Sequence, residues 1–529
     1  MRRDDELRLA ELLGILSLAT DLGLGQPMEH VLRSCIIAVR LGERVGLDDD
    51  ELAALYYVAL LAFIGCTADA YEVAKWFGDD IAFKAGMYDI DFVGAPAVAY
   101  MLRRVGSDKP PWTRARLAAA LLTTGGKSIE AAMVESCQSA GLFAQRLDLG
   151  DDVQHALQHN FARWDGKGLP AKLGGDDIAL LMRIVHVAEL VEVHHRVSGV
   201  EEASAIARKR SGTVLDPMLA EAFCESAHEI LADLDDGSHW DEALALAPAL
   251  DRPLSGDAVD VALEAVADFI DLKSPFLAGH SRGVAELAVG AARHAGLRDP
   301  EVTALRRAAL LHDIGRTGVP NTIWDKPGPL TAGEWERVRL HAYYTERMLA
   351  RPALLARLAG IAGGHHERCD GSGYHRGASG EALTATARIL AAADAYHAML
   401  EPRPHRDAMT PEAAAGELRA DVTAGRLDAD AVNAVLAAAG HKVGRRRTGP
   451  SGLTAREIDV VIQLARGFSN KEIAARLHIS PKTVARHLEN IFTKLGIRTR
   501  TAAALYAMQH GLVDPLQPVD ADPEVVAGA

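Results

Sequence analysis

The chain has 529 residues, more than one hydrophobic core usually organises, so we expect about three to four domains. Apolar residues make up 49% and charged residues 24% of the sequence, which excludes a wholly disordered or fibrous chain. The formal net charge of −15 argues, as an average over the chain, against a protein that coats nucleic acid or lies on a membrane surface.

Cysteine usage and apolar runs bear on the compartment. The five cysteines are widely spaced and form no CxxC pair, so neither a disulfide framework nor a zinc knuckle is indicated. The charged N-terminus, Met1 to Leu13, shows no secretory segment. The uncharged stretch from Leu52 to Ala68 has the length of a short membrane span, and we interpret it as a buried core helix. We therefore expect a cytoplasmic protein without membrane contact.

The first 440 residues contain a duplication. Residues 58–67 and 308–317 are identical at six of ten positions, at an offset of 250. Residues 163–175 match 368–380 at an offset of 205, so the first copy carries 45 extra residues between its two blocks. Ala, Leu, Glu and Arg dominate both copies, and apolar residues recur at spacings of three and four, which predicts helices. We expect an all-α fold with two tandem copies, residues 1–245 and 250–440.

The second copy concentrates side chains that bind metals. The adjacent pairs His312-Asp313 and His365-His366 stand in apolar helical stretches, where unpartnered polar groups are costly. Imidazole and carboxylate ligands suit manganese, iron or zinc, and one carboxylate can bridge two ions. The pattern predicts a binuclear metal site. Its candidate ligands are His280, His312, Asp313, His341, His365, His366 and Asp394.

At these residues the sequence resembles the HD-GYP family, a branch of the HD phosphohydrolase superfamily. The resemblance runs from about Asp271 to Arg406 and includes HSRGVAELA, LLHDIGRTGVP, HHERCDGSGYHRG and RILAAADAYHAMLEPRPHR. It implies an all-helical domain that hydrolyses cyclic di-GMP with two divalent metals, iron or manganese, with zinc, magnesium or nickel as alternatives. It also implies that one ion is held by His280, His312, Asp313 and Asp394, and that Asp313 bridges to a second held by His341, His365 and His366.

The same resemblance assigns the substrate contacts. Arg316 stands where the family has a lysine, and its guanidinium can grip a phosphate with two hydrogen bonds. His375 replaces the proline of GYP and His397 replaces the second acidic residue of DxxDA, so these departures concern substrate recognition. Phe276 stands where some members have a glutamate for a third metal, so we expect two metals. The resemblance implies Asp313 and Arg316 as catalytic residues and Arg316, Tyr374, Arg403 and Arg406 as substrate contacts.

The first copy has lost the same set of ligands. Ala62-Phe63 stands at the place of His312-Asp313, and Asn160-Phe161 at the place of His365-His366. His30 and Glu189 remain at ligand positions. Residues 1–245 are therefore predicted to be a degenerate, non-catalytic HD-like domain, and the sequence leaves open whether it senses a ligand, mediates dimerisation or serves as a scaffold.

The last part of the chain reverses the charge. From Lys442 to Asp514 there are 13 Lys and Arg against 5 Asp and Glu, so the average over the chain conceals a basic module. Thr454 with Glu457, and Ser469 with Glu472, have the spacing of capping boxes, and Ser480-Pro481 is typical of a helix start. These signals predict four helices, at 455–466, 470–477, 481–495 and 500–510.

This segment, residues 453–514, resembles the LuxR-type helix-turn-helix domain. The resemblance implies that residues 481–495 form the recognition helix in the major groove of double-stranded DNA, and that the protein binds as a homodimer. We expect a flexible basic linker at 441–452 and a disordered tail at 515–529. The candidate DNA contacts are Lys471, Lys482, Thr483, Arg486, His487, Asn490 and Arg498.

The leading hypothesis is a metal-dependent phosphodiesterase that hydrolyses a cyclic dinucleotide, cyclic di-GMP first, and is coupled to a DNA-binding transcription regulator domain. Two alternatives stay open. One is a regulator that senses a nucleotide or a metal without hydrolysis, and the other is an HD phosphohydrolase that acts on another nucleotide.

Overall fold

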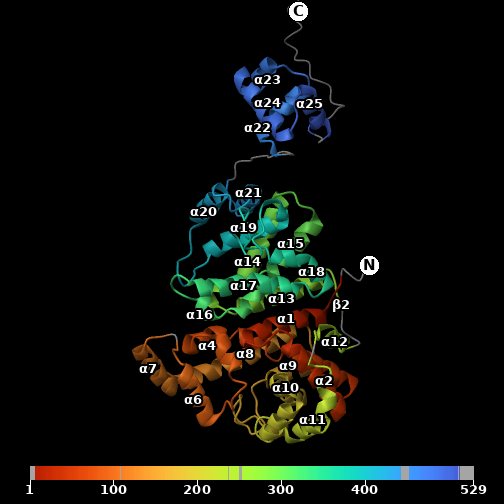
Figure 1. Ribbon diagram of the computed structural model, residues 1–529, viewed down its shortest axis with the longest axis vertical. Helices are drawn as coiled ribbons and strands as arrows, with labels where there is room; N and C mark the ends of the chain where they lie inside the picture. Colours follow the sequence, from red (N-terminus) through yellow and green to blue (C-terminus); the bar gives the residue numbers. More distant parts are fainter. Residues whose placement is uncertain are drawn as a thin grey trace, which may run out of the picture. The chain divides into compact units, whose positions relative to one another are not determined.

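The computed structural model describes residues 6–107, 109–235, 237–248, 253–442, 452–509 and 512. Regular structure in these ranges is almost entirely helical, which confirms the all-α prediction (Figure 1). The exception is an antiparallel pair of two-residue strands, β1 (Leu7–Arg8) and β2 (Pro253–Leu254). The chain divides into two compact units, Met1–His441 and Lys442–Ala529. Most of the predicted linker, residues 443–451, and the predicted tail, 515–529, lie outside the described residues.

All five cysteines of the chain are free thiols.

The first copy is built from helices and short turns, where η marks a 3-10 turn and η3 a π-helical one. The elements of the first copy are α1 (Leu9–Leu24), α2 (His30–Val45), α3 (Asp49–Leu61), η2 (Ile64–Thr67), α4 (Ala70–Phe77), α5 (Asp80–Ala85), α6 (Gly94–Arg104), α7 (Pro111–Ala120), η3 (Leu121–Gly125), α8 (Gly126–Arg146), α9 (Asp151–Leu157), η4 (Gly175–Asp177), α10 (Leu180–Arg210), α11 (Pro217–Ile230) and α12 (Trp240–Ala245).

The second copy repeats the same helical plan with fewer elements between the two blocks that it shares with the first copy. Its elements are α13 (Asp257–Asp271), η5 (Pro275–Leu277), α14 (His280–His294), α15 (Asp299–Leu311), η6 (Ile314–Gly318), α16 (Asn321–Trp324), α17 (Ala332–Leu349), α18 (Ala353–Ala362), η7 (Gly380–Ala382), α19 (Ala385–Leu400), α20 (Pro411–Thr423) and α21 (Ala429–Ala438).

The offsets seen in the sequence recur in the structure. Helices α2 and α3 begin 250 residues before α14 and α15, and α10 begins 205 residues before α19. In each copy a glycine follows the repeated isoleucine, and a Cβ atom there would lie 2.0 Å from a backbone oxygen: Ser136 O for Gly65 and His341 O for Gly315. The close approach that each glycine permits brings α8 onto η2 in one copy and α17 onto η6 in the other.

Helix α1 joins the two copies. It is apolar around its whole circumference and almost completely buried, as expected of a helix covered on all sides. It packs against α2 and η2 of the first copy and against η6 and α17 of the second (Figure 1). The segment Asp49–Thr67 is long and apolar enough to cross a membrane, but 67% of it is buried inside the protein, where α3 packs on α2 and α10.

The C-terminal unit is a small helical domain with its own core. Its helices are α22 (Ala455–Ala465), α23 (Asn470–Arg476), α24 (Pro481–Leu495) and α25 (Arg500–Gln509), within one residue of the predicted bounds. Both predicted capping boxes form, and the Ser480 hydroxyl accepts from Thr483 N at the start of α24. The apolar faces of the four helices meet in one cluster that includes Val460, Ile473, Val484, Leu488 and Ala503.

Candidate metal centre and DNA-binding surface

The seven predicted ligands converge from five places in the second copy. His280 begins α14, His312 and Asp313 follow α15, and His341 lies on α17. His365 and His366 follow α18, and Asp394 lies on α19. These side chains are buried, except that the His366 side chain keeps an exposed fraction of 18%. Helix packing therefore brings together residues that are up to 114 positions apart in the sequence.

Asp313 stands at the centre of the cluster. Its Oδ2 atom lies 3.1 Å from His312 Nε2 and 3.6 Å from His280 Nε2. Its Oδ1 atom lies 3.6 Å from His341 Nε2 and 3.5 Å from His365 Nε2. Each oxygen of the carboxylate thus faces a different pair of imidazoles, so Asp313 links two groups of candidate ligands.

Asp394 completes one side of the cluster and approaches the other. Its Oδ1 atom is 3.3 Å from His280 Nε2 and 3.8 Å from His312 Nε2, while its Oδ2 atom is 3.9 Å from His366 Nδ1. His341, His365 and His366 form a second group whose ligand atoms lie within 4.8 Å of one another. The seven side chains therefore form two adjoining groups around Asp313.

Hydrogen bonds behind the cluster fix the orientation of four imidazoles. The Nδ1 atoms of His312 and His365 donate to backbone carbonyls 2.7 and 2.6 Å away, and His341 Nδ1 donates to the Val338 carbonyl. His280 Nδ1 donates to Glu401 Oε2 at 2.9 Å. Each ring therefore presents Nε2 to the cluster, which is how histidines that bind metals are usually held.

The atoms that face the cluster lack hydrogen-bond partners and suit a cation. The Nε2 atoms of His280 and His312 and both oxygens of Asp313 are buried in close contact, but without hydrogen-bond geometry. His341 Nε2 and His365 Nε2 are 3.1 Å apart, so with both rings neutral their lone pairs would face each other. Buried acceptors without donors are costly, and a divalent ion would satisfy several of them at once.

The ionisation states agree with a ligand role. Burial would raise the pKa of Asp313, but the Arg316 guanidinium and His312 outweigh it and hold that pKa well below its usual range. The same balance, with His280 and His312 as partners, lowers the pKa of Asp394. Burial and the neighbouring His365 lower the pKa of His341 to about 3, which leaves this imidazole neutral. Burial would lower the pKa values of His280 and His312, but the neighbouring carboxylates outweigh it and raise both, that of His312 to about 10. These two imidazoles would release a proton when a metal binds. The cluster therefore offers anionic carboxylates, a neutral imidazole and two imidazoles whose protons a metal would displace.

Arg316 lies at the edge of the cluster. Its Nε atom forms an ion pair with Asp313 Oδ2 at 2.8 Å, and its guanidinium lies 4.6 Å from the Trp324 ring centre. Tyr374, from the loop before η7, has its ring centre 4.7 Å from that of His366. Two predicted substrate contacts thus adjoin the metal ligands.

The two predicted arginines that follow α19 have different surroundings. Arg403 is paired with Glu401 at 2.6 Å, and burial and the nearby Arg316 guanidinium lower its pKa, which places it beside the cluster. Arg406 donates to the carbonyls of Ala398 and Met399, so its guanidinium is engaged by the end of α19. The geometry gives Arg406 the role of shaping the loop that carries Arg403.

Sequence reasoning missed Glu401. Its carboxylate accepts from His280 and also contacts His397 Nδ1 at 3.3 Å. Burial would raise its pKa, but hydrogen bonds from His280 and His397 lower that pKa to about 2. The spacing of Asp394, His397 and Glu401 is i, i+3, i+7, which places all three near one face of a helix and could have indicated the link. No comparable signal in the sequence marked Trp324 or Thr345 as neighbours of the site. The Thr345 hydroxyl donates to His312 O at 2.9 Å.

His375, which replaces the proline of GYP, contacts a glutamate outside the set of candidate metal ligands. Its Nε2 atom is 3.1 Å from Glu346 Oε2 on α17. His397 contacts Glu401 and lies with its ring centre 5.5 Å from that of His280. Neither residue takes the position of a predicted ligand.

The first copy has an ion-pair network at the equivalent place. His30 Nε2 is 2.8 Å from Glu189 Oε1, and His30 Nδ1 contacts Glu192. Burial would lower the pKa of His30, but the two glutamates outweigh it and raise that pKa to about 10. A protonated histidine between two carboxylates therefore stands where the second copy has metal ligands, and Phe63 occupies the place of Asp313.

The C-terminal unit presents most of the predicted DNA contacts on its surface. Lys482, Arg486 and Asn490 are exposed and recur every four residues along α24. Thr483 and His487 lie beside them and are partly buried, and the Thr483 hydroxyl is 2.8 Å from that of Ser480. Lys471 and Arg498 are also exposed. A basic stripe on the second helix of a helix-turn-helix is the arrangement that reads a major groove.

A helical core with clustered His and Asp ligands defines an HD-type metal-dependent phosphohydrolase, here on one chain with a helix-turn-helix unit. Residues 264–431 match the family model described as HD domain, and residues 451–507 match that of bacterial regulatory proteins of the luxR family. The chain belongs to the HD-GYP family of phosphodiesterases.

Three comparisons carry this assignment. The chain is 33% identical over 406 residues to 3'3'-cGAMP-specific phosphodiesterase 3 of Vibrio cholerae, and this alignment covers 76% of this chain and 88% of that protein. The crystal structure of a cyclic GMP-AMP specific phosphodiesterase from V. cholerae matches 83% of this chain and 99% of its own, with a TM-score of 0.58 and 28% identity. A cyclic di-GMP phosphodiesterase response regulator of Xanthomonas campestris is 40% identical over 148 residues, 27% of this chain and 39% of that protein.

Proposed function

We propose that the second copy hydrolyses a cyclic dinucleotide with two divalent ions, and that the C-terminal unit connects this activity to promoter DNA in the cytoplasm. The observation that carries the proposal is the position of Asp313, each of whose oxygens faces a separate pair of imidazole Nε2 atoms at 3.1 to 3.6 Å.

The two groups divide into two ligand sets. One set is His280, His312, Asp313 and Asp394, and the other is Asp313, His341, His365 and His366. Nitrogen and oxygen ligands of this kind suit iron or manganese, with zinc, magnesium or nickel as alternatives. When bound, such ions would supply Lewis acidity toward the phosphate and lower the pKa of water.

The protein's own side chains would handle the charge and position of the substrate. Arg316, held between Asp313 and the Trp324 ring, would donate to the phosphate oxygens as negative charge develops on them. Arg403 adds a second cation at the same edge. Tyr374 offers an aromatic face next to His366, on which a base can stack.

The proposed substrate class includes both 3'3'-cGAMP and cyclic di-GMP. The relative that spans most of this chain is named for 3'3'-cGAMP, whereas shorter matches are named for cyclic di-GMP. The two molecules share phosphodiester bonds and differ in one base, so residues that contact the base decide between them. Because His375 pairs with Glu346 outside both ligand sets, its replacement of the proline in GYP would bear on substrate recognition and not on the phosphodiester chemistry.

The experiment uses the purified full chain loaded with Mn²⁺ or Fe²⁺, incubated in parallel with 3'3'-cGAMP and cyclic di-GMP, with chromatographic detection of linear dinucleotide. Product is expected from at least one of them, and the double variant His312→Ala, Asp313→Ala should form none. A mobility-shift assay on promoter DNA should be unchanged in this variant. Failure of the metal-loaded protein to cleave either nucleotide would refute the enzymatic part.

A second candidate function is nucleotide sensing without hydrolysis. It is favoured by His397, which replaces the second acidic residue of the DxxDA stretch and contacts one oxygen of the Glu401 carboxylate while His280 binds the other. It predicts that nucleotide changes promoter affinity while no product forms.

We further propose that the protein binds DNA as a homodimer, which light scattering after size-exclusion chromatography would test.

A further inference from the structure

The first copy has a half-open cavity of about 500 Å³ at the place where the second copy has its candidate metal ligands. Phe63, Asn160 and Phe161 line it, and at the two offsets of the duplication they correspond to Asp313, His365 and His366. Glu189, the counterpart of Asp394, lines it as well. The volume lies within the range of sites for small organic molecules.

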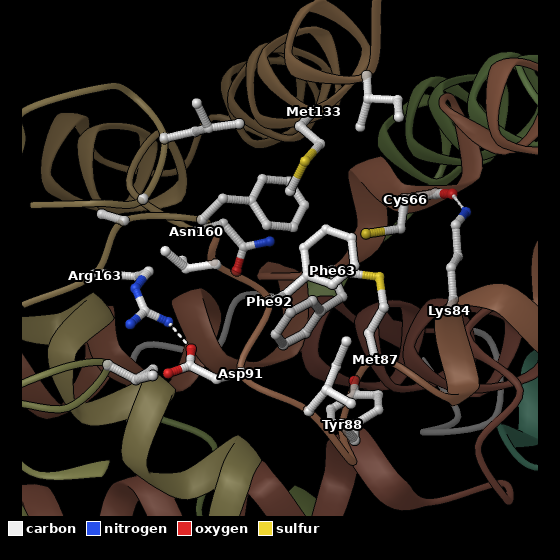
Figure 2. A pocket seen from close by; sticks show the side chains of 18 of the residues that line it. Phe63, Cys66, Lys84, Met87, Tyr88, Asp91, Phe92, Met133, Asn160 and Arg163 are labelled. Carbon is white, nitrogen blue, oxygen red and sulfur yellow. Dashed lines mark hydrogen bonds and ion pairs between the residues drawn. The ribbon is translucent and has the colours of Figure 1, made fainter. Parts of the chain in front are cut away.

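The 45 residues that only the first copy carries help to build the walls of this cavity. Phe77 and Phe83 stack with their ring centres 4.0 Å apart, and Phe92 meets Phe83 edge to face. Together with Tyr100 these rings form a small apolar cluster of their own. Figure 2 shows the Phe63 and Phe92 rings and the Met133 side chain turned toward the middle of the cavity. The added segment therefore supports an aromatic lining around the place of the lost ligands.

Three cations on the lining of the cavity, Lys84, Arg163 and Arg210, are each paired with a carboxylate. Lys84 Nζ lies 2.6 Å from Asp69 Oδ1. One oxygen of the Asp91 carboxylate lies 2.6 Å from the Arg163 guanidinium, and the other lies 2.9 Å from that of Arg210. Because each of these cations already has a carboxylate, the lining offers poor counter-charge for a phosphate, and an uncharged ligand fits it better.

Two buried acceptors on the lining lack partners. Asn160 is 94% buried, and its Oδ1 atom has no hydrogen-bond partner. His186 Nε2 donates to the Asn160 carbonyl at 2.9 Å, which leaves Nδ1 as a lone-pair acceptor, and this atom is also buried without a partner. Burial lowers the pKa of His186 to about 4, so the ring is neutral. In Figure 2 the Asn160 amide points toward the Phe63 ring.

We propose that the first copy binds a flat, uncharged aromatic molecule whose N–H or O–H groups donate to the side chains of Asn160 and His186. The aromatic walls supply apolar contact area, and the paired charges disfavour phosphate groups. The two acceptors without hydrogen-bond partners favour a ligand that carries N–H or O–H donors over one that carries none. The degenerate copy is thereby a ligand-binding domain. This assignment is independent of whether the second copy hydrolyses a nucleotide.

Two probes of the same shape test the proposal on the full chain. 2-Phenylindole carries one N–H donor, and 2-phenylbenzofuran has an oxygen in its place. Fluorescence titration should show saturable binding of both probes, with 2-phenylindole about fivefold tighter, the difference that one net hydrogen bond of about 1 kcal/mol gives. Cyclic di-GMP should displace neither probe.

Three variants locate the site. Met133→Trp fills the cavity from α8 and should abolish binding of both probes. Asn160→Leu keeps the shape but removes the acceptor, so the preference for 2-phenylindole should fall while 2-phenylbenzofuran still binds. Gln158→Leu, at an exposed position two residues away, is the matched control and should bind as the parent does.

Several results would overturn the proposal. They are the lack of saturable binding of both probes to the parent chain, unchanged binding in Met133→Trp, an undiminished preference in Asn160→Leu, or displacement of the probes by cyclic di-GMP. Circular dichroism and the melting temperature establish that each variant is folded, and Asn160→Leu provides the test if Met133→Trp is not. Since the readout is binding to the first copy, a failure here is distinct from a failure of hydrolysis in the second.

Discussion

Glu401 provides a sharp test of the proposed metal centre, because it acts on a ligand without being one. Its Oε2 atom accepts from His280 Nδ1 at 2.9 Å, and its lowered pKa of about 2 means that it is a carboxylate at neutral pH. A carboxylate behind an imidazole fixes the ring and makes Nε2 a stronger donor to a metal. Glu401→Gln keeps an acceptor but loses the charge, whereas Glu401→Ala loses both.

Changes to such supporting residues cost about 10- to 100-fold in metal affinity, or about 1.4 to 2.7 kcal/mol. A charged hydrogen bond is about twice as strong as a neutral one, so Glu401→Gln should lie near the tenfold end and Glu401→Ala near the hundredfold end. The loss should fall on the ion held by His280, His312 and Asp394, and spare the group of His341, His365 and His366.

Isothermal titration of the metal-free protein with Mn²⁺ resolves the two affinities, and Mn²⁺ electron paramagnetic resonance counts the bound ions. Glu381→Gln, at an exposed position in η7, is the matched control and should bind both ions as the parent does. Unchanged affinities in both Glu401 variants, or an equal loss in the control, would refute the positioning role of Glu401.

Three further predictions concern other parts of the molecule. Gly315→Ala should lower the free energy of unfolding by about 1–3 kcal/mol in urea titrations, because its Cβ would lie 2.0 Å from His341 O, whereas Gly333→Ala, with open space, should leave it nearly unchanged. Arg486→Ala should weaken promoter binding by about 1–3 kcal/mol in mobility-shift assays, and an unchanged affinity would contradict its assignment. The pKa of His30 is raised from 6.5 to about 10 by its two glutamates, so the stability it contributes is complete below pH 6.5 and is lost as pH rises toward 10. Thermal unfolding should show this decline, and His30→Gln should lack it.

The sequence indicated the chemistry of the second copy because four of its seven candidate ligands stand in two adjacent pairs. His312-Asp313 and His365-His366 are local signals, and helical periodicity predicted that each pair would be carried into a core. The helix starts of the C-terminal unit were equally local, since a capping box needs only four residues. By contrast, the average charge of −15 gives no guide to nucleic-acid binding, because it sums over an acidic part and the basic C-terminal unit.

The contacts behind the ligands and the fate of the first copy required the tertiary structure. Glu401 reaches His280 across 121 positions, and the helical spacing that places Glu401 near Asp394 does not by itself state that it will contact His280. The engagement of Arg406 by the end of α19 is likewise a matter of loop geometry.

The first copy shows the difference most clearly. Its sequence alone determined that the metal ligands are gone, since Phe63 cannot replace Asp313 as a ligand. Whether the space then closes or stays open depends on how helices far apart in the sequence pack. The structure leaves it open as a cavity of about 500 Å³, because the extra segment surrounds the site with rings instead of filling it. Ligand chemistry is a property of individual residues, whereas a cavity exists only once the whole domain has folded.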